Sequence, residues 1–334
     1  MKSYMARLFA FMMFFVVVCG ECVARTPRSM AERAIYTYAP PRIEIYSPDV
    51  EDTVRVMVVA DTHLWISDQR EEPFREYSHR MAAAYHTTSH YATGVETSPE
   101  KSLRAVADLA VRRGVDAVAL LGDIVSYPSE RAVELVCEVM DGAGVPWYYT
   151  CGNHDWHYEG MAGGRLELRE EWRAKRLSPL FRGNNPNCYA VEIKGVRLLF
   201  VDSSTYDILP EQYEFMRREV RSGKPLVLMM HIPLYAPGRP VGYGIGHPDW
   251  NAAHDNGYKV ERRERWPEGG HTELDYRFYD LVTTAPNLLC SFAGHVHTYG
   301  VDVIGGKPHY TVQMNARGGY YEVIIYPKKS CIKM

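Results

Sequence analysis

Short runs of apolar, β-prone residues recur along the chain, and five of them end directly at a cluster of polar residues. The runs are Val54–Ala60, Val115–Leu121, Pro146–Cys151, Leu226–Met230 and Leu288–Ala293. Continuous apolar runs of this length predict strands that are buried on both faces. The pattern therefore predicts a sheet core whose strands all end beside polar side chains.

Between the first three runs the apolar positions change to helical spacing. This spacing predicts one helix over Pro99–Arg113, ended by Gly114 as a C-terminal cap. A second helix is predicted over Ser129–Met140, with Ser129 as N-cap and Asp141-Gly142 as the stop. Strands that alternate with helices imply right-handed crossovers and a largely parallel sheet.

The second half of the chain predicts a different kind of strand. We expect a hairpin formed by Cys188–Ile193 and Val196–Val201. We also expect a terminal series of strands over Tyr299–Ile304, His309–Met314 and Tyr320–Tyr326. Together the two halves predict an α/β fold, in which two mixed β-sheets pack face to face and are flanked by helices.

One domain, residues 53–328, is expected to carry this fold, with three long insertions at 64–98, 156–187 and 232–272. Insertions of this length are usually functional or partly disordered. All three follow polar clusters, so we expect them to rise from one edge of the sheet as lid loops. The Pro-containing segment 25–52 is interpreted as a leader lying along the domain, and residues 329–334 as a tail.

The third insertion is rich in aromatic residues and histidines among glycines. They are Tyr235, Tyr243, His247, Trp250, His254, Tyr258 and Trp266. Such rings could grip the organic portion of a substrate, or they could pack the insertion against the body of the protein. The sequence leaves both interpretations open.

The first residues predict export. Lys2 and Arg7 lead into the apolar run Leu8–Cys19, and the small residues up to Ala24 suit signal peptidase, so residues 1–24 are interpreted as a signal peptide. The run is shorter than the roughly 20 apolar residues of a membrane-spanning helix, although a signal anchor stays an alternative. The residues before Cys19 and Cys22 disfavour a lipid anchor. We expect a periplasmic or secreted protein with no stable membrane insertion after cleavage.

Charge and cysteine content disfavour two classes of protein, nonspecific nucleic-acid binders and disulfide-stabilised scaffolds. The full chain has 38 Lys+Arg and 41 Asp+Glu, of which residues 1–24 hold two and one, so the mature chain keeps 36 and 40, a net charge of −4. Nonspecific nucleic-acid binding needs a basic patch, and the local cluster Arg262, Arg263 and Arg265 fits a solvated surface better. The five cysteines after residue 24 lack the spacing of a disulfide scaffold. No nucleic-acid partner is expected.

The polar clusters carry the candidate chemistry. They are Asp61-x-His63, Gly122-Asp123, Gly152-Asn153-His154-Asp155, His231 and Gly294-His295-x-His297. Open α/β sheets bind ligands where parallel strands end. Carboxylate, amide and imidazole donors without a thiolate suit Zn, Mn or Fe, and a pair of such ions cleaves phosphoesters. The set therefore predicts a site for two divalent metal ions.

In order and spacing the clusters resemble the calcineurin-like metallophosphoesterases, over about Val54 to His297. The resemblance implies the four-layer sandwich of that family and two ligand sets that share Asp123: Asp61, His63, Asp123 and His297 for one metal, and Asp123, Asn153, His231 and His295 for the other. It also implies that His154 lies just outside the metals, pairs with Asp155, and protonates the leaving oxygen or stabilises the transferring phosphoryl group. Ser126 stands three residues after Asp123, where the tyrosine-bearing purple acid phosphatases have their ligand, so we expect a colourless protein.

Charge favours an anionic substrate. The positive charge of two divalent ions exceeds the combined negative charge of Asp61, Asp123 and a bridging hydroxide. A phosphate would therefore meet net positive charge. We therefore expect hydrolysis of a small phosphate ester by a metal-bridging hydroxide, with diesters favoured over monoesters because of the aromatic third insertion. Of the eight other histidines, the best candidates for further contacts are His157, His247 and His254.

Two other functions stay open on the sequence. A metal-binding homologue without turnover would have no use for His154 and Asp155 beside its ligands. A nuclease would act on a polyanion, which the acidic balance of the chain disfavours.

Overall fold

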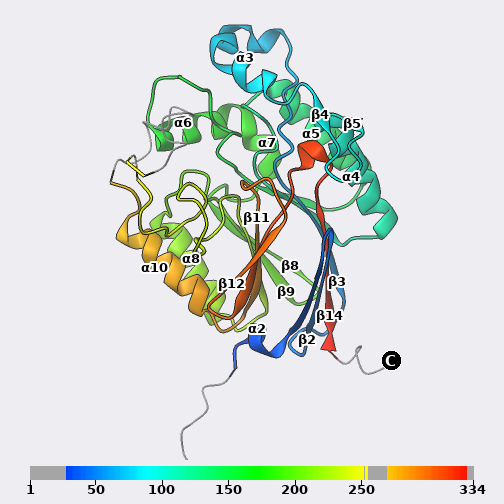
Figure 1. Cartoon of the computed structure of the whole chain (residues 1–334), viewed down its shortest axis with the longest axis vertical. Helices are drawn as coiled ribbons and strands as arrows, with labels where there is room; N and C mark the ends of the chain where they lie inside the picture. Colours follow the sequence, from blue (N-terminus) through cyan, green and yellow to red (C-terminus); the bar gives the residue numbers. More distant parts are fainter. Residues whose placement is uncertain (1–27, 252, 255–268, 329–334) are drawn as a thin grey trace, which may run out of the picture.

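The computed structural model describes residues 28–251, 253–254 and 269–328. Within them, two six-stranded sheets pack against each other, with helices on their outer faces (Figure 1). Several predictions fall on residues outside the described ranges: the signal peptide at 1–24, the tail at 329–334, Tyr258, Trp266 and the basic cluster Arg262, Arg263 and Arg265.

The first sheet has the strand order β1-β2-β14-β3-β6-β7. Its strands are β1 (Ile35–Ala39), β2 (Arg42–Ser47), β14 (Tyr321–Pro327), β3 (Val54–Val59), β6 (Ala117–Leu121) and β7 (Trp147–Thr150). Strands β3, β6 and β7 run parallel, and β14 is antiparallel to β3 and parallel to β2. The C-terminal strand therefore lies between two strands from the start of the chain.

Strands β1 and β2 correct our interpretation of segment 25–52 as a leader. Ile43 and Ile45 are fully buried while Arg42 is exposed and Glu44 is half-buried, which is the alternation of a strand with one covered face. The two strands pair as an antiparallel hairpin around Pro40-Pro41. The sheet thus begins at Ile35, ahead of the expected domain boundary at residue 53.

The second sheet has the strand order β12-β13-β11-β10-β9-β8. Its strands are β12 (Gly300–Ile304), β13 (Lys307–Thr311), β11 (Leu288–Ala293), β10 (Leu226–Met229), β9 (Val196–Val201) and β8 (Cys188–Ile193). The four central strands are parallel, and the edge strands β8 and β12 pair antiparallel with their neighbours. The predicted hairpin over β8 and β9 is present.

Helices α4 (Pro99–Arg113) and α5 (Glu130–Ala143) cover the first sheet, and α8 (Pro210–Arg221) and α10 (Glu273–Thr284) cover the second (Figure 1). Strand β3 shows why its residues are apolar throughout. Val56 and Val58 belong to the core between the sheets, whereas Met57 and Val59 belong to the core beneath α4 and α5. The four layers confirm the predicted α/β fold of two packed mixed sheets flanked by helices.

The insertions contain short elements. The first holds η1 (Gln69–Phe74), α3 (Arg75–Ala83), β4 (Thr88–Ser89) and β5 (Glu96–Thr97), and the second holds α6 (Arg165–Trp172), the π-helical turn η2 (Arg173–Leu177) and α7 (Ser178–Phe181). The remaining elements are α2 (Met30–Arg33) and η3 (Asn315–Arg317). In the described part of the third insertion an isolated bridge joins Leu234 to Ile245. Over the described ranges, no helix is long and apolar enough to cross a membrane.

Candidate metal centre

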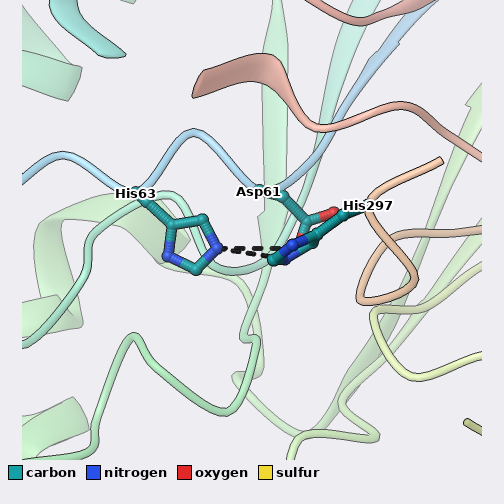
Figure 2. A group of neighbouring side chains, drawn as sticks. All are labelled: Asp61, His63 and His297. Carbon is teal, nitrogen blue, oxygen red and sulfur yellow. Dashed lines mark hydrogen bonds and ion pairs between the residues drawn. The ribbon is translucent and has the colours of Figure 1, made fainter. Parts of the chain in front are cut away.

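The predicted ligands converge where β3, β6, β10 and β11 end. Two groups of donor atoms form, each with all its atoms within 4.8 Å of one another. One group is Asp61, His63 and His297 (Figure 2) and the other is Asp123, His231 and His295. Residues from both sheets contribute, because Asp61 and Asp123 follow strands of the first sheet and the later histidines follow strands of the second.

The backbone at this edge is strained at five of the ligands. Asp61, His63, Asp123, His295 and His297 all have φ between 49° and 68°, in the left-handed region. Each such non-glycine residue costs on the order of 1–2 kcal/mol and persists only where surrounding contacts fix it. Those contacts include the amide of Asp61 donating to Gly122 O and that of His63 donating to Asp123 O. Strain held in this way is typical of a functional site.

Two glycines allow the turns after β6 and β7 to touch. Gly122 has φ of 77°, and a Cβ on it would lie 2.3 Å from the amide nitrogen of Gly152. A Cβ on Gly152 would lie 2.2 Å from Oδ1 of Asp123. No side chain fits at either position, so the glycines bring the Asp123 carboxylate against the chain that carries Asn153 and His154.

The first donor group is compact (Figure 2). Nε2 of His297 lies 3.3 Å from Oδ1 of Asp61 and 3.3 Å from Nε2 of His63. Both oxygens of Asp61 also accept from the amide of His295, at 3.1 and 3.0 Å. The ring of Tyr85, from the first insertion, stacks on His63 with centroids 4.2 Å apart. Three donors therefore meet beneath an aromatic ring.

In the second group, a main-chain carbonyl sets the tautomer of His231. Nδ1 of His231 lies 2.7 Å from the carbonyl oxygen of Leu121. Because a carbonyl only accepts, Nδ1 carries a proton, which leaves Nε2 as the nitrogen that faces Asp123. Nε2 lies 3.2 Å from Oδ2 of Asp123. The ring is thus held in the orientation that a metal ion at Nε2 requires, once Nε2 has given up its proton.

The electrostatics of the buried site favour positive charge. Burial works against ionisation of His231, yet the charge of Asp123 and a hydrogen bond to it raise the pKa of His231 to about 9. Asp61 raises the pKa of His297 in the same way, also against burial. Burial opposes a charged Asp123 too, but His231 and His154 hold the pKa of that carboxyl well below its usual range. Burial, reinforced by His154, lowers the pKa of His63. Two carboxylates that attract cations this strongly suit divalent ions.

Asn153 supplies a further observation that fits a metal. Its Oδ1 is buried and accepts no hydrogen bond from any residue in the described part of the chain. A buried amide oxygen without a donor is costly unless a cation or another group occupies it. Asn153 follows β7, directly after Gly152, which lies against the carboxylate of Asp123. The residues present therefore fit a pair of ions bound by oxygen and nitrogen.

The expected pairing of His154 with Asp155 is wrong. Oδ2 of Asp155 accepts from the amides of Asp123 and Gly152, at 2.8 and 2.7 Å, and Oδ1 accepts from that of Val125, at 2.9 Å. Among the described residues, no hydrogen bond joins Asp155 to His154. The fully buried carboxyl of Asp155 accepts from three backbone amides in place of one imidazole. Burial and the neighbouring Asp123 raise the pKa of Asp155 to about 7. Asp155 therefore shapes the turn that presents Asp123.

His154 itself lies beside the donors. Its amide donates to Oδ1 of Asp123 at 2.7 Å, and its ring meets His63 edge to face with centroids 4.9 Å apart. Nδ1 is buried without a hydrogen-bond partner in the described ranges, while the residue as a whole is half-buried. The ring is thus oriented by packing, next to both donor groups.

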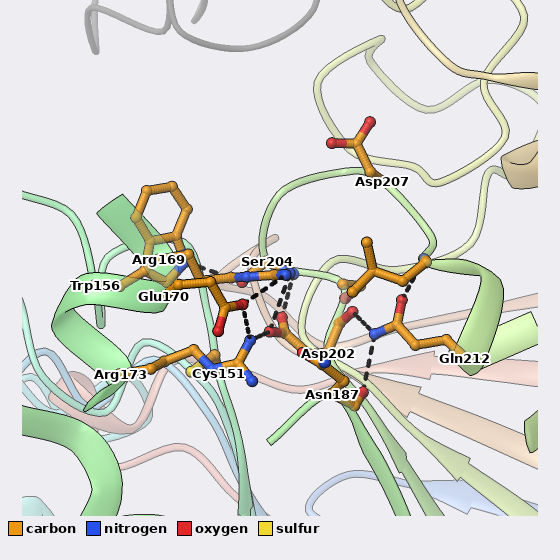
Figure 3. A network of polar contacts seen from close by, with 12 residues as sticks. Cys151, Trp156, Arg169, Glu170, Arg173, Asn187, Asp202, Ser204, Asp207 and Gln212 are labelled. Atoms are coloured by element: carbon orange, nitrogen blue, oxygen red, sulfur yellow. Dashed lines mark hydrogen bonds and ion pairs between the residues drawn. The ribbon is translucent and has the colours of Figure 1, made fainter. Parts of the chain in front are cut away.

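Residues of the second insertion hold the loop that follows β9, near the site (Figure 3). Arg169 and Arg173, both buried, converge on Oδ2 of Asp202 at 3.4 and 3.3 Å. Nε1 of Trp156 donates to Oγ of Ser204 at 2.9 Å. These contacts fix the loop after β9 against helix α6 and turn η2.

Tyr206 is a site residue that the sequence analysis missed. Its Oη lies 2.7 Å from Nε2 of His295, and its ring stacks on Trp250 of the third insertion with centroids 4.7 Å apart. Trp250 is buried and so packs that insertion onto the body, whereas Tyr243 is 37% exposed and meets His295 edge to face at 5.5 Å. The only signal in the sequence was a tyrosine five residues beyond a strand.

The other candidates in the sequence have different partners. The hydroxyl of Tyr127 donates to Trp65 O at 2.6 Å, and Ser126 donates to His63 O at 3.0 Å, so both are occupied by backbone. His247 packs on Tyr235 inside the third insertion. Among the described residues no disulfide forms, and Cys137, Cys151, Cys188 and Cys290 are free thiols there.

Comparison with known proteins agrees with this geometry. Residues 54–299, more than half of the chain, match the profile of one family, described as calcineurin-like phosphoesterase. A solved dimetal phosphatase from Danio rerio is similar at 13% identity, with 83% of this chain and 94% of that chain covered and a TM-score of 0.50. Purple acid phosphatase PPD1 from yellow lupin is similar at 14% identity, with 84% and 48% covered and a TM-score of 0.45. At such identities the likeness shows the fold alone. A search of curated proteins found no match.

Proposed function

From the premise that the chain belongs to the calcineurin-like phosphoesterase family, we propose that it hydrolyses phosphate esters with two divalent metal ions and prefers diesters to monoesters. One observation supports this most: two donor groups, Asp61 with His63 and His297, and Asp123 with His231 and His295, meet at one edge of the fold. Two adjacent ions are the arrangement that phosphoester cleavage uses.

Each ion would have its own ligands and share one carboxylate. Asp61, His63, Asp123 and His297 would hold the first, and Asp123, Asn153, His231 and His295 the second. Two observations support this division: Oδ1 of Asn153 has no hydrogen-bond partner among the described residues, and Nδ1 of His231 carries a proton. Zn, Mn and Fe all suit such nitrogen and oxygen donors.

When bound, the metal pair supplies a nucleophile derived from water and neutralises the phosphoryl oxygens. The chain must supply the proton for the leaving group, and His154 is the residue proposed to do so. With Nδ1 buried, Nε2 is the nitrogen from which the proton would pass to the leaving oxygen. Asp155 would act indirectly, through the amides that hold Asp123 in place.

The preference for diesters rests on the two tyrosines beside the ligands. Tyr85 stacks on His63 and Tyr243 meets His295, so a ring from a different insertion flanks each donor group. A diester carries an organic group on both sides of its phosphate. Aromatic rings on both sides would offer each group a contact surface, and a monoester would use only one.

The test is turnover of bis-p-nitrophenyl phosphate and p-nitrophenyl phosphate by the mature chain. Bound metal is first removed, and Mn, Zn and Fe are then restored separately. We expect metal-dependent cleavage with the higher kcat/KM on the diester. A higher kcat/KM on the monoester would overturn the preference. Two tightly bound ions without turnover of either ester would favour the metal-binding homologue instead, and steeply salt-dependent cleavage of DNA or RNA would favour the nuclease.

We also propose that the protein is exported, on the strength of the signal-peptide pattern at residues 1–24. Expression of the full chain in a bacterial host, followed by fractionation and N-terminal sequencing, tests this. We expect a product that begins after Ala24 in the periplasm or medium. An uncleaved chain in the membrane fraction would support the signal-anchor alternative.

A further inference from the structure

Tyr206 occupies an unusual position beside the metal centre. It is fully buried, and its φ of 62° lies in the left-handed region, which an aromatic residue rarely adopts. The loop that carries it is fixed at both ends: Ser203 Oγ accepts from the amide of Ile232 at 2.9 Å, and Oδ1 of Asp275 accepts from that of Ile208 at 2.6 Å. Such an anchored, strained residue indicates a demand on its side chain.

The hydrogen bonds of Tyr206 define the proton on His295. Tyr206 Oη contacts the carbonyl oxygen of Gly242, and Nε2 of His295 lies 3.1 Å from the same oxygen. Because this oxygen only accepts, Tyr206 donates its hydroxyl proton to Gly242. The 2.7 Å contact between Oη and Nε2 then requires Nε2 of His295 to be the donor. Nε2 carries the proton, so Nδ1 holds the lone pair that binds a metal.

The same contacts reach into the third insertion. Gly242 belongs to it, and so does Trp250, which stacks on Tyr206 with the ring planes only 7° apart. The acceptor that fixes Tyr206 is therefore present only when this insertion is seated. Partners of this kind orient a ligating histidine and strengthen its binding of the metal.

We propose that Tyr206 is a positioning residue that holds Nδ1 of His295 toward the second metal and makes the affinity for that metal depend on the placement of residues 242–250, the described part of the third insertion that contacts Tyr206. The inference rests on the proposed two-metal centre. By linkage, a metal bound there stabilises the seated insertion by the same factor.

The test compares Tyr206→Phe with the wild type in metal binding. The variant keeps the ring that stacks on Trp250 and loses only the hydroxyl. We expect one of the two bound metals to bind about 10- to 100-fold more weakly and the other to bind as in the wild type, measured by competition with a chelator and by metal analysis. Tyr243→Phe is the matched control, because Tyr243 also contacts the ring of His295, but edge to face. We expect its metal affinities to equal those of the wild type.

Hydrogen exchange over residues 241–251 provides the second readout. In the wild type, metal should slow exchange of these amides; in Tyr206→Phe, saturating metal should slow it much less. Equal affinities and equal protection in wild type and variant would overturn the inference while leaving the two-metal centre intact. A wild type that binds fewer than two ions would overturn both proposals. Circular dichroism and the thermal midpoint in chelator establish that the variant is folded.

Discussion

At the scale of single residues, Asp123 has the most roles at the centre. It belongs to one donor group, lies 4.0 Å from Nε2 of His63 in the other, and accepts the amide of His154. Its own amide is held by Asp155. One carboxylate thus joins the ligands of both proposed ions to the proposed proton donor.

We predict that Asp123→Asn binds at most one metal ion and loses measurable turnover. Asparagine keeps the shape and tolerates the left-handed backbone, so the loss reflects the missing charge. Metal analysis after gel filtration and steady-state kinetics measure the two effects. A thermal midpoint in chelator equal to that of the wild type serves as the folding control. Retention of two ions and of activity would show that Asp123 is not shared.

His154→Ala should keep both metals and lose the proton donor. General acid catalysis contributes about 10²- to 10⁴-fold, and its contribution is greatest when the leaving group is a poor one. We therefore expect a large fall in kcat for an alkyl ester and a much smaller one for a p-nitrophenyl ester. Equal losses on both esters would contradict the role of proton donor.

The sequence indicated residues that meet at the candidate centre, but not how the backbone holds them. Asp61 and His63 could be proposed as ligands because they follow a predicted strand and match the first motif of the family. Their positive φ could not be predicted, because most non-glycine residues have negative φ. Asp155 was assigned to His154 because adjacent polar residues suggest a pair. Its real partners are backbone amides, which a sequence does not display. Tyr206 depends on contacts with residues far along the chain.

At the scale of elements, the second insertion supports the site through one row of arginines. Arg165, Arg169 and Arg173 are four residues apart, so they lie on one side of α6 and the turn that follows it. Arg165 pairs with Asp207. Arg169 and Arg173 share Asp202, as Figure 3 shows. The row fixes the loop that carries Tyr206.

We predict that Asp202→Asn lowers the free energy of unfolding by about 3–5 kcal/mol, because two buried guanidinium groups lose their shared carboxylate. Denaturation in guanidinium chloride measures the change. Glu170→Gln is the control: Glu170 pairs with the same two arginines, but its side chain is 60% exposed, so we expect a loss below about 1 kcal/mol. Similar losses in both variants would contradict this account.

The pairing of β11 with β13 places His309 beside Ser291, with Oγ 2.5 Å from Nδ1. Burial lowers the pKa of His309 to about 4. The unfolded chain binds a proton on this residue below about pH 6.5, and the folded chain does so only below about pH 4. Its contribution to stability is therefore present above pH 6.5 and is lost as pH falls toward 4.

We predict that this single histidine changes the unfolding free energy by about 1.4 kcal/mol per pH unit between pH 6.5 and 4. Denaturation curves for wild type and His309→Asn across this range measure it as a difference, in which the other titrating groups cancel. Parallel pH profiles for the two proteins would mean that His309 titrates normally.

The elements were predicted unevenly for a physical reason. Helix α4 and strands β8 and β9 occupy their predicted ranges, because capping residues and turn glycines mark their ends. Helices α8 and α10 were not predicted. Each buries few apolar residues among polar ones: Phe215 and Met216 in α8, and Phe278 and Val282 in α10. Strands β1 and β2 were not predicted because the prolines around them favoured the interpretation of the segment as an irregular leader.

At the scale of the whole molecule, the donor groups join the two sheets. Asp61 and Asp123 follow strands of the first sheet, and His231 and His295 follow strands of the second. A bound ion would therefore add a link between the two sheets, which also touch through the apolar core between them and through hydrogen bonds such as that from Tyr189 Oη to Tyr149 O.

We predict that metal raises the free energy of unfolding by about 2.7 kcal/mol at a free concentration 100 times the dissociation constant. Denaturant unfolding with buffered metal, compared with chelator, measures this. Asp123→Asn should respond much less to the same metal concentration. A wild type whose stability is unchanged by metal would mean that the folded state has no ion to lose.

Strand β14 has a consequence for how the protein is made. It lies between β2 and β3, although the ribosome produces those two strands early and β14 after the other strands of both sheets. A nascent chain therefore keeps a gap inside its first sheet, with the main-chain groups of β2 and β3 lacking their final partner. If synthesis stops before β14, the edges of β2 and β3 stay unpaired. Truncated chains should therefore be prone to aggregation and proteolysis, whichever metal the cell provides.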